Sequence, residues 1–169
     1  MKYKVTKKQN SSKSCIVCGI ENKLGLKTSF YELENGELVA LCDTKDWHQS
    51  YPGRVHGGIS AALLDETIGR AVSINDDTIW GVTVTLETKY RKPVPTDVQI
   101  KIVGRITKEN RRMFEGTGEI ILPNGDIAVS ATGKYMKMGV EAITEGGMDE
   151  GEWFFDEDEE KIEYIELPY

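Results

Sequence analysis

The alternation of apolar and polar positions predicts mostly β-strands in this chain. Six segments carry a strand pattern: Leu26–Leu33, Glu37–Asp43, Ile79–Tyr90, Val98–Ile106, Glu115–Leu122 and Asp126–Met138. An Asn-Gly pair separates the first two segments and another separates the last two, at Asn35-Gly36 and Asn124-Gly125. Asn-Gly is the strongest short-range signal for a hairpin turn. The pattern therefore predicts an antiparallel sheet of five or six strands that contains two hairpins.

One segment, from His56 to Val72, has the helical period instead. Ala61, Leu64 and Ile68 recur with Val72 at steps of three and four residues, which places them on one face of a helix. Most other positions of the segment are also small or apolar, as is typical of a helix that a sheet wraps. One long helix with five or six antiparallel strands is an α+β layout.

Composition divides the chain into three parts. The chain has 169 residues, a hydrophobic fraction of 39% and a net charge of -7, which suits one soluble domain with a real core. Residues 1–14 contain five lysines and form a basic N-terminal arm, whereas residues 141–169 contain twelve acidic residues and one lysine. We expect a domain over residues 15–140 and an acidic, solvated C-terminal tail.

Several classes of protein are excluded by the same numbers. No stretch is long and apolar enough to span a membrane, and the lysine-rich start is no secretory signal. Three cysteines give no disulfide framework, so a reducing cytoplasm is the expected compartment. No basic stripe is dense enough for nucleic acid, and the mildly positive body suits a small anionic ligand better.

The candidate chemistry lies where the helix begins. Gly57 and Gly58 leave unpaired backbone N–H groups at the positive end of the helix dipole, where they could stabilise a carbonyl oxygen as it gains charge. Asp65 follows on the same helix, although a carboxylate among apolar residues is costly unless it meets a cavity, a partner or solvent. The two features together favour an active site over a simple turn and a solvated patch.

These residues resemble the hotdog-fold acyl-CoA thioesterases, and among them the phenylacetate-pathway (PaaI-like) group. His56-Gly57-Gly58 followed by Asp65 carries the resemblance, and the segments Cys15–Gly19 and Gly81–Pro93 extend it. The similarity spans Cys15 to Met138. It implies a hotdog fold, in which an antiparallel sheet wraps one long helix, and hydrolysis of an acyl-CoA thioester without a metal or a redox cofactor.

The resemblance also implies roles for single residues. Gly57 would polarise the thioester carbonyl through its N–H, and Gly58 would keep the turn open. Asp65 would act either as the general base for water or as the nucleophile, with the hydroxyl of Thr83 holding the water or the carboxylate. Ser50 stands where the family often has an Asn or Gln that orients the thioester.

Neighbouring polar residues have structural interpretations as well. His56 is expected to fix the Gly57 amide rather than to act as a base, and Glu66 points about 100° away from Asp65 around the helix. Cys15 and Cys18 could begin a zinc site, but a structural site usually needs four ligands. We expect no metal there, and take the two cysteines as apolar residues at a chain turn.

Three basic residues, Lys89, Arg91 and Lys92, follow one another closely at the end of a predicted strand. They could protect a solvated strand edge, as lysines commonly do. They could instead form an electropositive lip that binds the phosphates of coenzyme A. The sequence leaves both interpretations open.

Two other functions compete with hydrolysis. Asp43 and His48 have the Asp-x4-His spacing with which hotdog enoyl-CoA hydratases activate water, although the residues between them do not resemble that motif. A hotdog protein could also bind acyl-CoA as a sensor or scaffold without turnover, but pure binding does not require an acid that faces a thioester.

The spacing of Gly57 and Asp65 predicts a site built from two chains. Eight residues separate them, which is about 12 Å along the helix axis, too far for both to act on one carbonyl. Two antiparallel helices in a C2 dimer bring each helix start to the middle of the other. We therefore expect a homodimer or a dimer of dimers, as the resemblance also implies.

Overall fold

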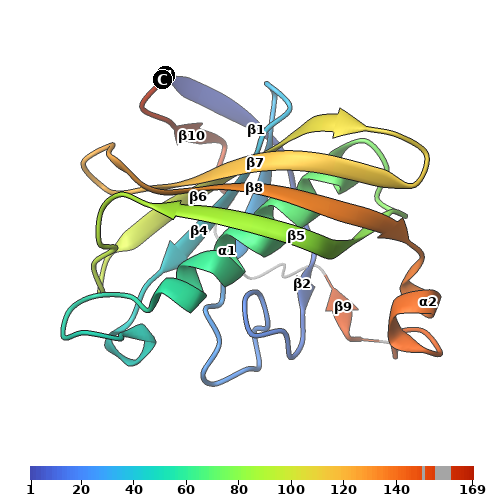
Figure 1. Ribbon diagram of the computed structural model, residues 1–169, viewed down its shortest axis with the longest axis horizontal. Coiled ribbons are helices and arrows are strands. Elements are labelled where there is room, and N and C mark those ends of the chain that lie inside the picture. The colour runs from blue at the N-terminus through green and yellow to red at the C-terminus, as the bar shows by residue number, and fades with distance from the viewer. Residues whose placement is uncertain (150, 155–160) are drawn as a thin grey trace.

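A long helix lies in the concave face of a curved antiparallel sheet in the computed structural model of the chain (Figure 1). The structure describes residues 1–149, 151–154 and 161–169. The strands are β1 (Lys2–Lys8), β2 (Ser11–Ser12), β3 (Ser29–Leu33), β4 (Leu38–Asp43), β5 (Trp80–Tyr90), β6 (Gln99–Glu109), β7 (Met113–Ile121), β8 (Ile127–Met138), β9 (Trp153–Phe154) and β10 (Tyr164–Glu166). The helical elements are α1 (Gly57–Arg70), α2 (Val140–Thr144) and the 3-10 turns η1 (Asp46–His48) and η2 (Ala71–Ile74). The predicted α+β layout is confirmed.

The six predicted strands are all present, with bounds shifted by a few residues. The first begins at Ser29 instead of Leu26, because Lys27 has a positive φ of 49° that interrupts an extended chain. Both Asn-Gly turns form hairpins, and Gly36 and Gly125 adopt φ values of 82° and 86° that favour glycine. The local turn chemistry thus fixed the β3–β4 and β7–β8 pairings.

The helix packs into the sheet by means of glycines on the strands. A Cβ atom added to Gly104 of β6 would lie 2.7 Å from the Thr67 carbonyl oxygen, and one on Gly116 of β7 would lie 2.5 Å from Ile68. Such contacts are too short for any side chain, so the α1 backbone comes very close to β6 and the Ile68 side chain packs directly on the backbone of β7. Leu64 and Ile68 are fully buried there, as the periodicity predicted. This close packing fixes the position of α1, and so of each of its residues, relative to the strands.

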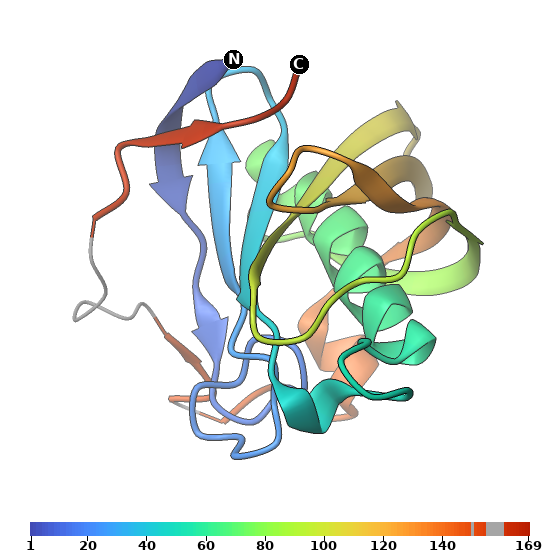
Figure 2. The same ribbon diagram turned by 90° about the vertical axis from the view of Figure 1, so that its left-hand side faces the viewer.

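The sheet has eight strands among the described residues, so the predicted number of five or six is wrong. Its order is β10-β1-β3-β4-β6-β7-β8-β5. The two additional strands come from the chain ends, where β1 lies in the expected arm and β10 in the expected tail (Figure 2). In the first half of β1, Lys2 and Lys4 alternate with the half-buried Tyr3 and Val5, which is a strand pattern that the high charge obscures.

The end of the acidic tail packs on the outer face of the sheet. Ile165 and Leu167 are 4% and 3% exposed and join a second apolar cluster with Tyr31, Val39 and Val103. The acidic run over residues 156–160 lies outside the described residues. In the parts of the chain that the structure describes, no helix is long and apolar enough to cross a lipid bilayer.

Candidate active site

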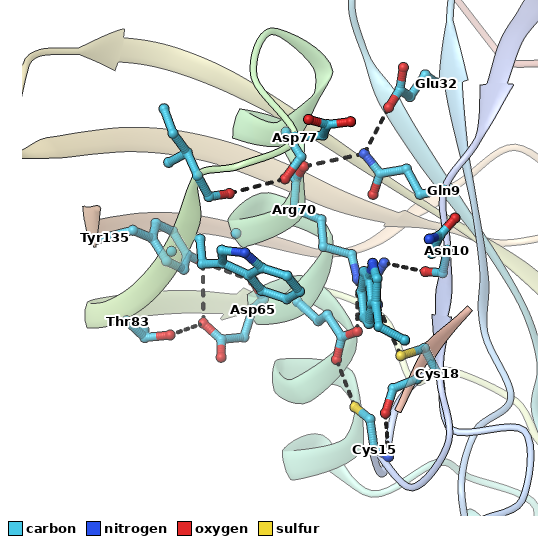
Figure 3. A pocket seen from close by; sticks show the side chains of 18 of the residues that line it. Gln9, Asn10, Cys15, Cys18, Glu32, Asp65, Arg70, Asp77, Thr83 and Tyr135 are labelled. Carbon is cyan, nitrogen blue, oxygen red and sulfur yellow. Dashed lines mark hydrogen bonds and ion pairs between the residues drawn. The ribbon is translucent and has the colours of Figure 1, made fainter. Parts of the chain in front are cut away.

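Asp65 lies on α1, and two hydroxyl groups, one from β5 and one from β8, hold its carboxylate (Figure 3). Thr83 Oγ1 of β5 donates to Asp65 Oδ1 over 2.8 Å, and the Tyr135 phenol of β8 donates to the same oxygen over 3.2 Å. Among the described residues no group donates to Asp65 Oδ2. The carboxylate is thus oriented through one oxygen, and the other is available to a ligand.

Sequence reasoning missed Tyr135, which is almost fully buried. Its ring stacks on Phe114 with centroids 4.9 Å apart and planes 8° from parallel, and its hydroxyl also reaches the Asp65 main-chain oxygen at 3.1 Å. Burial, and then the nearby Asp65 charge, raise the pKa of the Tyr135 phenol, so the phenol stays protonated and donates. Only the pairing of β5 with β8, which places Tyr135 opposite Thr83, reveals this role.

A cavity of about 810 Å³ opens beside Asp65. Its walls come from α1, from β5 and β8, and from the chain around β1 and β2, which are far apart in sequence (Figure 3). Trp80 and Trp153 pack edge to face across one part, whereas Gln9, Glu32 and Arg70 line another. The volume is that of an ordinary small-molecule site, and the lining combines aromatic and charged groups.

The start of α1 has an N-cap at His56. Its Nδ1 accepts from the Gly58 N–H at 2.9 Å, so the histidine binds the amide of Gly58 and not the amide of Gly57 that we expected. The Tyr90 hydroxyl donates to the Gly57 carbonyl over 2.7 Å. Among the described residues, nothing accepts from the Gly57 N–H. A half-buried donor without an acceptor in the described chain therefore remains at the positive end of the helix.

Glu66 also faces the cavity rather than bulk solvent. Arg70 Nε donates to Glu66 Oε1 over 2.9 Å, and the Cys15 thiol donates to Oε2 over 3.2 Å. Cys15 and Cys18 do sit at a turn, but both take part in polar contacts, so their interpretation as purely apolar residues is wrong. The reason is tertiary, because α1 brings Glu66 and Arg70 against the turn.

The three basic residues lie close to the start of α1 and away from the cavity. All are exposed: Lys89 pairs with Glu87, Arg91 donates to Ser130, and Lys92 pairs with Asp126 at 2.6 Å. Ser50 is exposed in the loop before α1 and does not line the cavity, and neighbouring Gln49 accepts from the Gly53 N–H. Within one chain, these residues and Asp65 are therefore not brought together.

Asp43 and His48 do not form a pair. Asp43 is exposed and accepts from Gln99, whereas His48 is buried and its Nδ1 accepts from the Lys45 N–H at 3.1 Å. Burial lowers the pKa of His48. Neither residue lines the cavity. The geometry suits a cap of η1 and gives no support to water activation.

Comparison with known proteins places this arrangement in context. The family model described as Thioesterase superfamily matches residues 52–129. An uncharacterized protein of Schizosaccharomyces pombe is 37% identical over 90 residues, which are 53% of this chain and 51% of that protein. Human acyl-coenzyme A thioesterase 13 is 24% identical over 119 residues, covering 70% of this chain and 79% of that protein. The chain thus spans about half the length of the yeast relative.

Solved structures give the fold. The crystal structure of a thioesterase superfamily protein superimposes with a TM-score of 0.67 and 30% identity, over 72% of this chain and 59% of that one. A Streptococcus mutans protein crystallised with acetyl-CoA has a TM-score of 0.56 and 23% identity, over 62% of this chain and 82% of that one. The expected hotdog fold is confirmed.

Proposed function

We propose that this chain is a thioesterase-superfamily enzyme that hydrolyses an acyl-CoA thioester to the free acid and coenzyme A, because the thioesterase-superfamily model matches residues 52–129 and human acyl-coenzyme A thioesterase 13 is a distant relative. The observation that carries the proposal is the Asp65 carboxylate, fixed by Thr83 and Tyr135 with one oxygen free at a cavity. The acetyl-CoA bound to the Streptococcus mutans relative supports the ligand class. The kinship to the phenylacetate-pathway (PaaI-like) group rests on the motif residues alone.

Asp65 is the group that we assign to water activation. In this step Asp65 Oδ2 takes a proton from water while the water oxygen attacks the thioester carbon. The carbon–sulfur bond then breaks, and the leaving coenzyme A thiolate takes the proton from Asp65. The hydrogen bonds from Thr83 and Tyr135 hold the carboxylate in one orientation. The carboxylate is therefore already positioned when the substrate binds. Direct attack by Asp65, through a mixed anhydride, uses the same geometry.

The Gly57 N–H is the group that we assign to the carbonyl oxygen. It has no acceptor among the residues that the structure describes, and it lies at the helix N-terminus, where a preorganised donor can stabilise an oxyanion. It lies about 12 Å along α1 from Asp65, so one chain cannot use both on one thioester. We assign the donor to one subunit and the acid to its partner in a C2 dimer.

The edge of the sheet supports such a dimer. In the part of the chain that the structure describes, strand β5 pairs only with β8, and its middle is exposed, with Val84 at 51%. A long, unpaired edge strand is a surface for pairing with another copy. In that arrangement Lys89, Arg91 and Lys92 of one chain stand near the Gly57 end of its helix, which is where the phosphates of the substrate would be held.

A thiol-release assay tests the proposal directly. The purified chain is given a panel of aryl-, short- and long-chain acyl-CoAs, and the coenzyme A thiol is titrated as it appears. Turnover of at least one member, lost in Asp65→Asn, supports the proposal. Absence of turnover on all of them by folded protein contradicts it, and tight acyl-CoA binding without turnover would indicate a sensor or scaffold.

A further inference from the structure

The Cys15–Cys18 turn forms part of the cavity wall opposite α1 (Figure 3). The turn is held rigidly: the Gly19 N–H donates to the Cys15 carbonyl over 2.8 Å, and the Cys15 N–H donates to Ser12 Oγ over 3.2 Å. A Cβ atom on Gly19 would lie 2.3 Å from the Cys15 carbonyl oxygen, so the turn depends on glycine there. The turn therefore brings both cysteines to the same part of the cavity wall.

The two sulfur atoms contact a carboxylate and a guanidinium group of α1. Both Sγ atoms and a Glu66 carboxylate oxygen lie within 4.8 Å of one another. The Cys15 thiol donates to Glu66 Oε2, while Arg70 Nη2 donates to the Cys18 sulfur over 2.9 Å. The guanidinium is itself packed between Phe30 and Trp153, at 4.2 and 4.5 Å from the ring centroids. Two thiols, a carboxylate and a fixed cation thus form one closed network.

The two cysteines differ in the way that thiol–disulfide chemistry requires. Cys15 is half-buried and lines the cavity, and the hydrogen bond from Cys18 lowers its pKa to about 7 against the opposing effects of burial and Glu66. Cys18 is 1% exposed, and the hydrogen bond to Cys15 together with burial raises its pKa. One thiol can attack an external disulfide, and the other is protected until the first has reacted.

The two thiols and the Glu66 carboxylate are the donor types of a metal site, but the position of Arg70 is evidence against one. Its guanidinium already binds Glu66 Oε1 and the Cys18 sulfur, so the cluster carries its own cation. Within the described residues no fourth His, Cys, Asp or Glu joins it. A zinc ion bound by these side chains would stand directly against a fixed positive charge.

We propose that Cys15 and Cys18 form a reversible disulfide in the cavity wall, and that its formation alters the Glu66–Arg70 network next to Asp65. The oxidant is a low-molecular-weight disulfide of the glutathione type. The Cys15 thiolate attacks one of its sulfurs and releases one thiol. The Cys18 thiol then loses its proton and attacks the Cys15 sulfur of the mixed disulfide, which releases the second thiol. Two protein thiols are oxidised and one disulfide is reduced to two thiols.

The consequence for the site follows from the hydrogen bonds that are lost. A disulfide has no S–H, so Glu66 Oε2 loses its donor, and the Cys18 sulfur becomes a poorer acceptor for Arg70. Glu66 adjoins Asp65 on α1, and both line the same cavity. The effect on turnover rests on the proposed function, whereas disulfide formation does not.

The experiment equilibrates the full chain in buffers with increasing ratios of oxidised to reduced glutathione, then alkylates free thiols and measures intact mass. We expect a folded species that has lost two hydrogens, mapped to a Cys15–Cys18 peptide and fully reversed by dithiothreitol. Cys42→Ser is the matched control, since Cys42 is buried and is not part of the cluster, and it should oxidise as the wild type does. Cys18→Ser should instead stop at a mixed disulfide with glutathione on Cys15.

Three results would overturn the proposal. The first is a wild-type chain that stays fully reduced in the most oxidising buffer, and the second is a disulfide that maps to Cys42. The third is copurified zinc at one ion per chain that protects both thiols from alkylation until a chelator is added. For the coupling to Asp65, we expect kcat or KM on an acyl-CoA substrate to change about threefold or more between the reduced and oxidised wild type. Equal kinetics would contradict that coupling.

Discussion

The phenol oxygen of Tyr135 lies 3.2 Å from Oδ1 of Asp65, although 70 residues separate the two in the chain. The contact joins the last long strand of the sheet to the middle of the helix. It also uses the same carboxylate oxygen as Thr83, so both donors leave Oδ2 to the cavity. The two hydrogen bonds therefore fix the orientation of the Asp65 carboxylate.

Removal of the Tyr135 hydroxyl tests how much that orientation contributes. Tyr135→Phe keeps the ring that stacks on Phe114 and deletes only the donor. Since a hydrogen bond to a charged group contributes roughly 1.5–3 kcal/mol, we expect kcat for thioester hydrolysis to fall about tenfold or more. Tyr164→Phe on the distant strand β10 is the matched control and should leave kcat unchanged. Equal kcat in all three proteins would show that Tyr135 has no positioning role.

The identity of the acid is tested by two neighbouring substitutions. Asp65→Asn keeps the size of the side chain but cannot take a proton from water, so kcat should fall about 10²-fold or more. Glu66→Gln should change kcat only a few-fold, because its amide oxygen still accepts from Arg70. Circular dichroism and acyl-CoA binding check that both variants fold. The reverse order of effects would identify Glu66 as the acid.

Gly57→Pro tests the oxyanion donor. Gly57 is the first residue of α1, where proline is favoured, and the substitution removes an N–H without a partner in the described chain. We expect nearly complete loss of turnover with an unchanged melting temperature. A Cβ at this position would only touch the Tyr90 ring at 3.5 Å, so Gly57→Ala is the control that retains the N–H and the activity.

Mixing inactive variants tests the site shared between chains. Gly57→Pro and Asp65→Asn homodimers should both be nearly inactive. Co-refolded at equal amounts, half of the dimers are mixed and carry one intact site, so about a quarter of wild-type activity should return. Mixed dimers that form but stay inactive would show that each site lies within one chain.

The reactivity of Cys15 should depend on pH in an unusual range. Only the thiolate reacts with iodoacetamide, and a pKa of about 7 means that the alkylation rate rises up to about pH 8 and then levels off. Cys18→Ala removes the largest cause of the lowered pKa, so the rise should move to higher pH. Cys42, whose pKa burial raises to about 11, should not react in the folded chain. Peptide mapping after timed alkylation distinguishes the three cysteines.

The C-terminal strand should stabilise the fold. Ile165 is 4% exposed in the second apolar cluster, so Ile165→Ala should lower the free energy of unfolding by roughly 2–5 kcal/mol. Glu166→Ala, at an exposed neighbouring position of β10, should change it by less than about 0.5 kcal/mol. Urea unfolding measures both. Equal stabilities would show that β10 is only loosely attached.

The local elements of this protein were determined by the sequence on its own. The helix from Gly57, the six predicted strands and both hairpins follow from periodicity and turn residues, because these signals act over a few neighbouring positions. The glycines before Asp65 marked the helix that carries the candidate site. The family resemblance also implied that the Thr83 hydroxyl holds either the water or the carboxylate, and the structure shows it on the Asp65 carboxylate.

Tertiary structure alone decided which of these elements meet. Periodicity says which face of a strand is buried, but not that β5 pairs with β8, and that pairing is what brings Tyr135 to Asp65. Charge concealed β1 and β10, the last two strands on one side of the sheet, because a strand can bury one face while the lysines and acids on its other face stay solvated. The Cys15 thiol meets Glu66, and the Cys18 sulfur meets Arg70, only because the helix carries both residues past the N-terminal turn. Such contacts depend on the three-dimensional course of the chain, which no local pattern encodes.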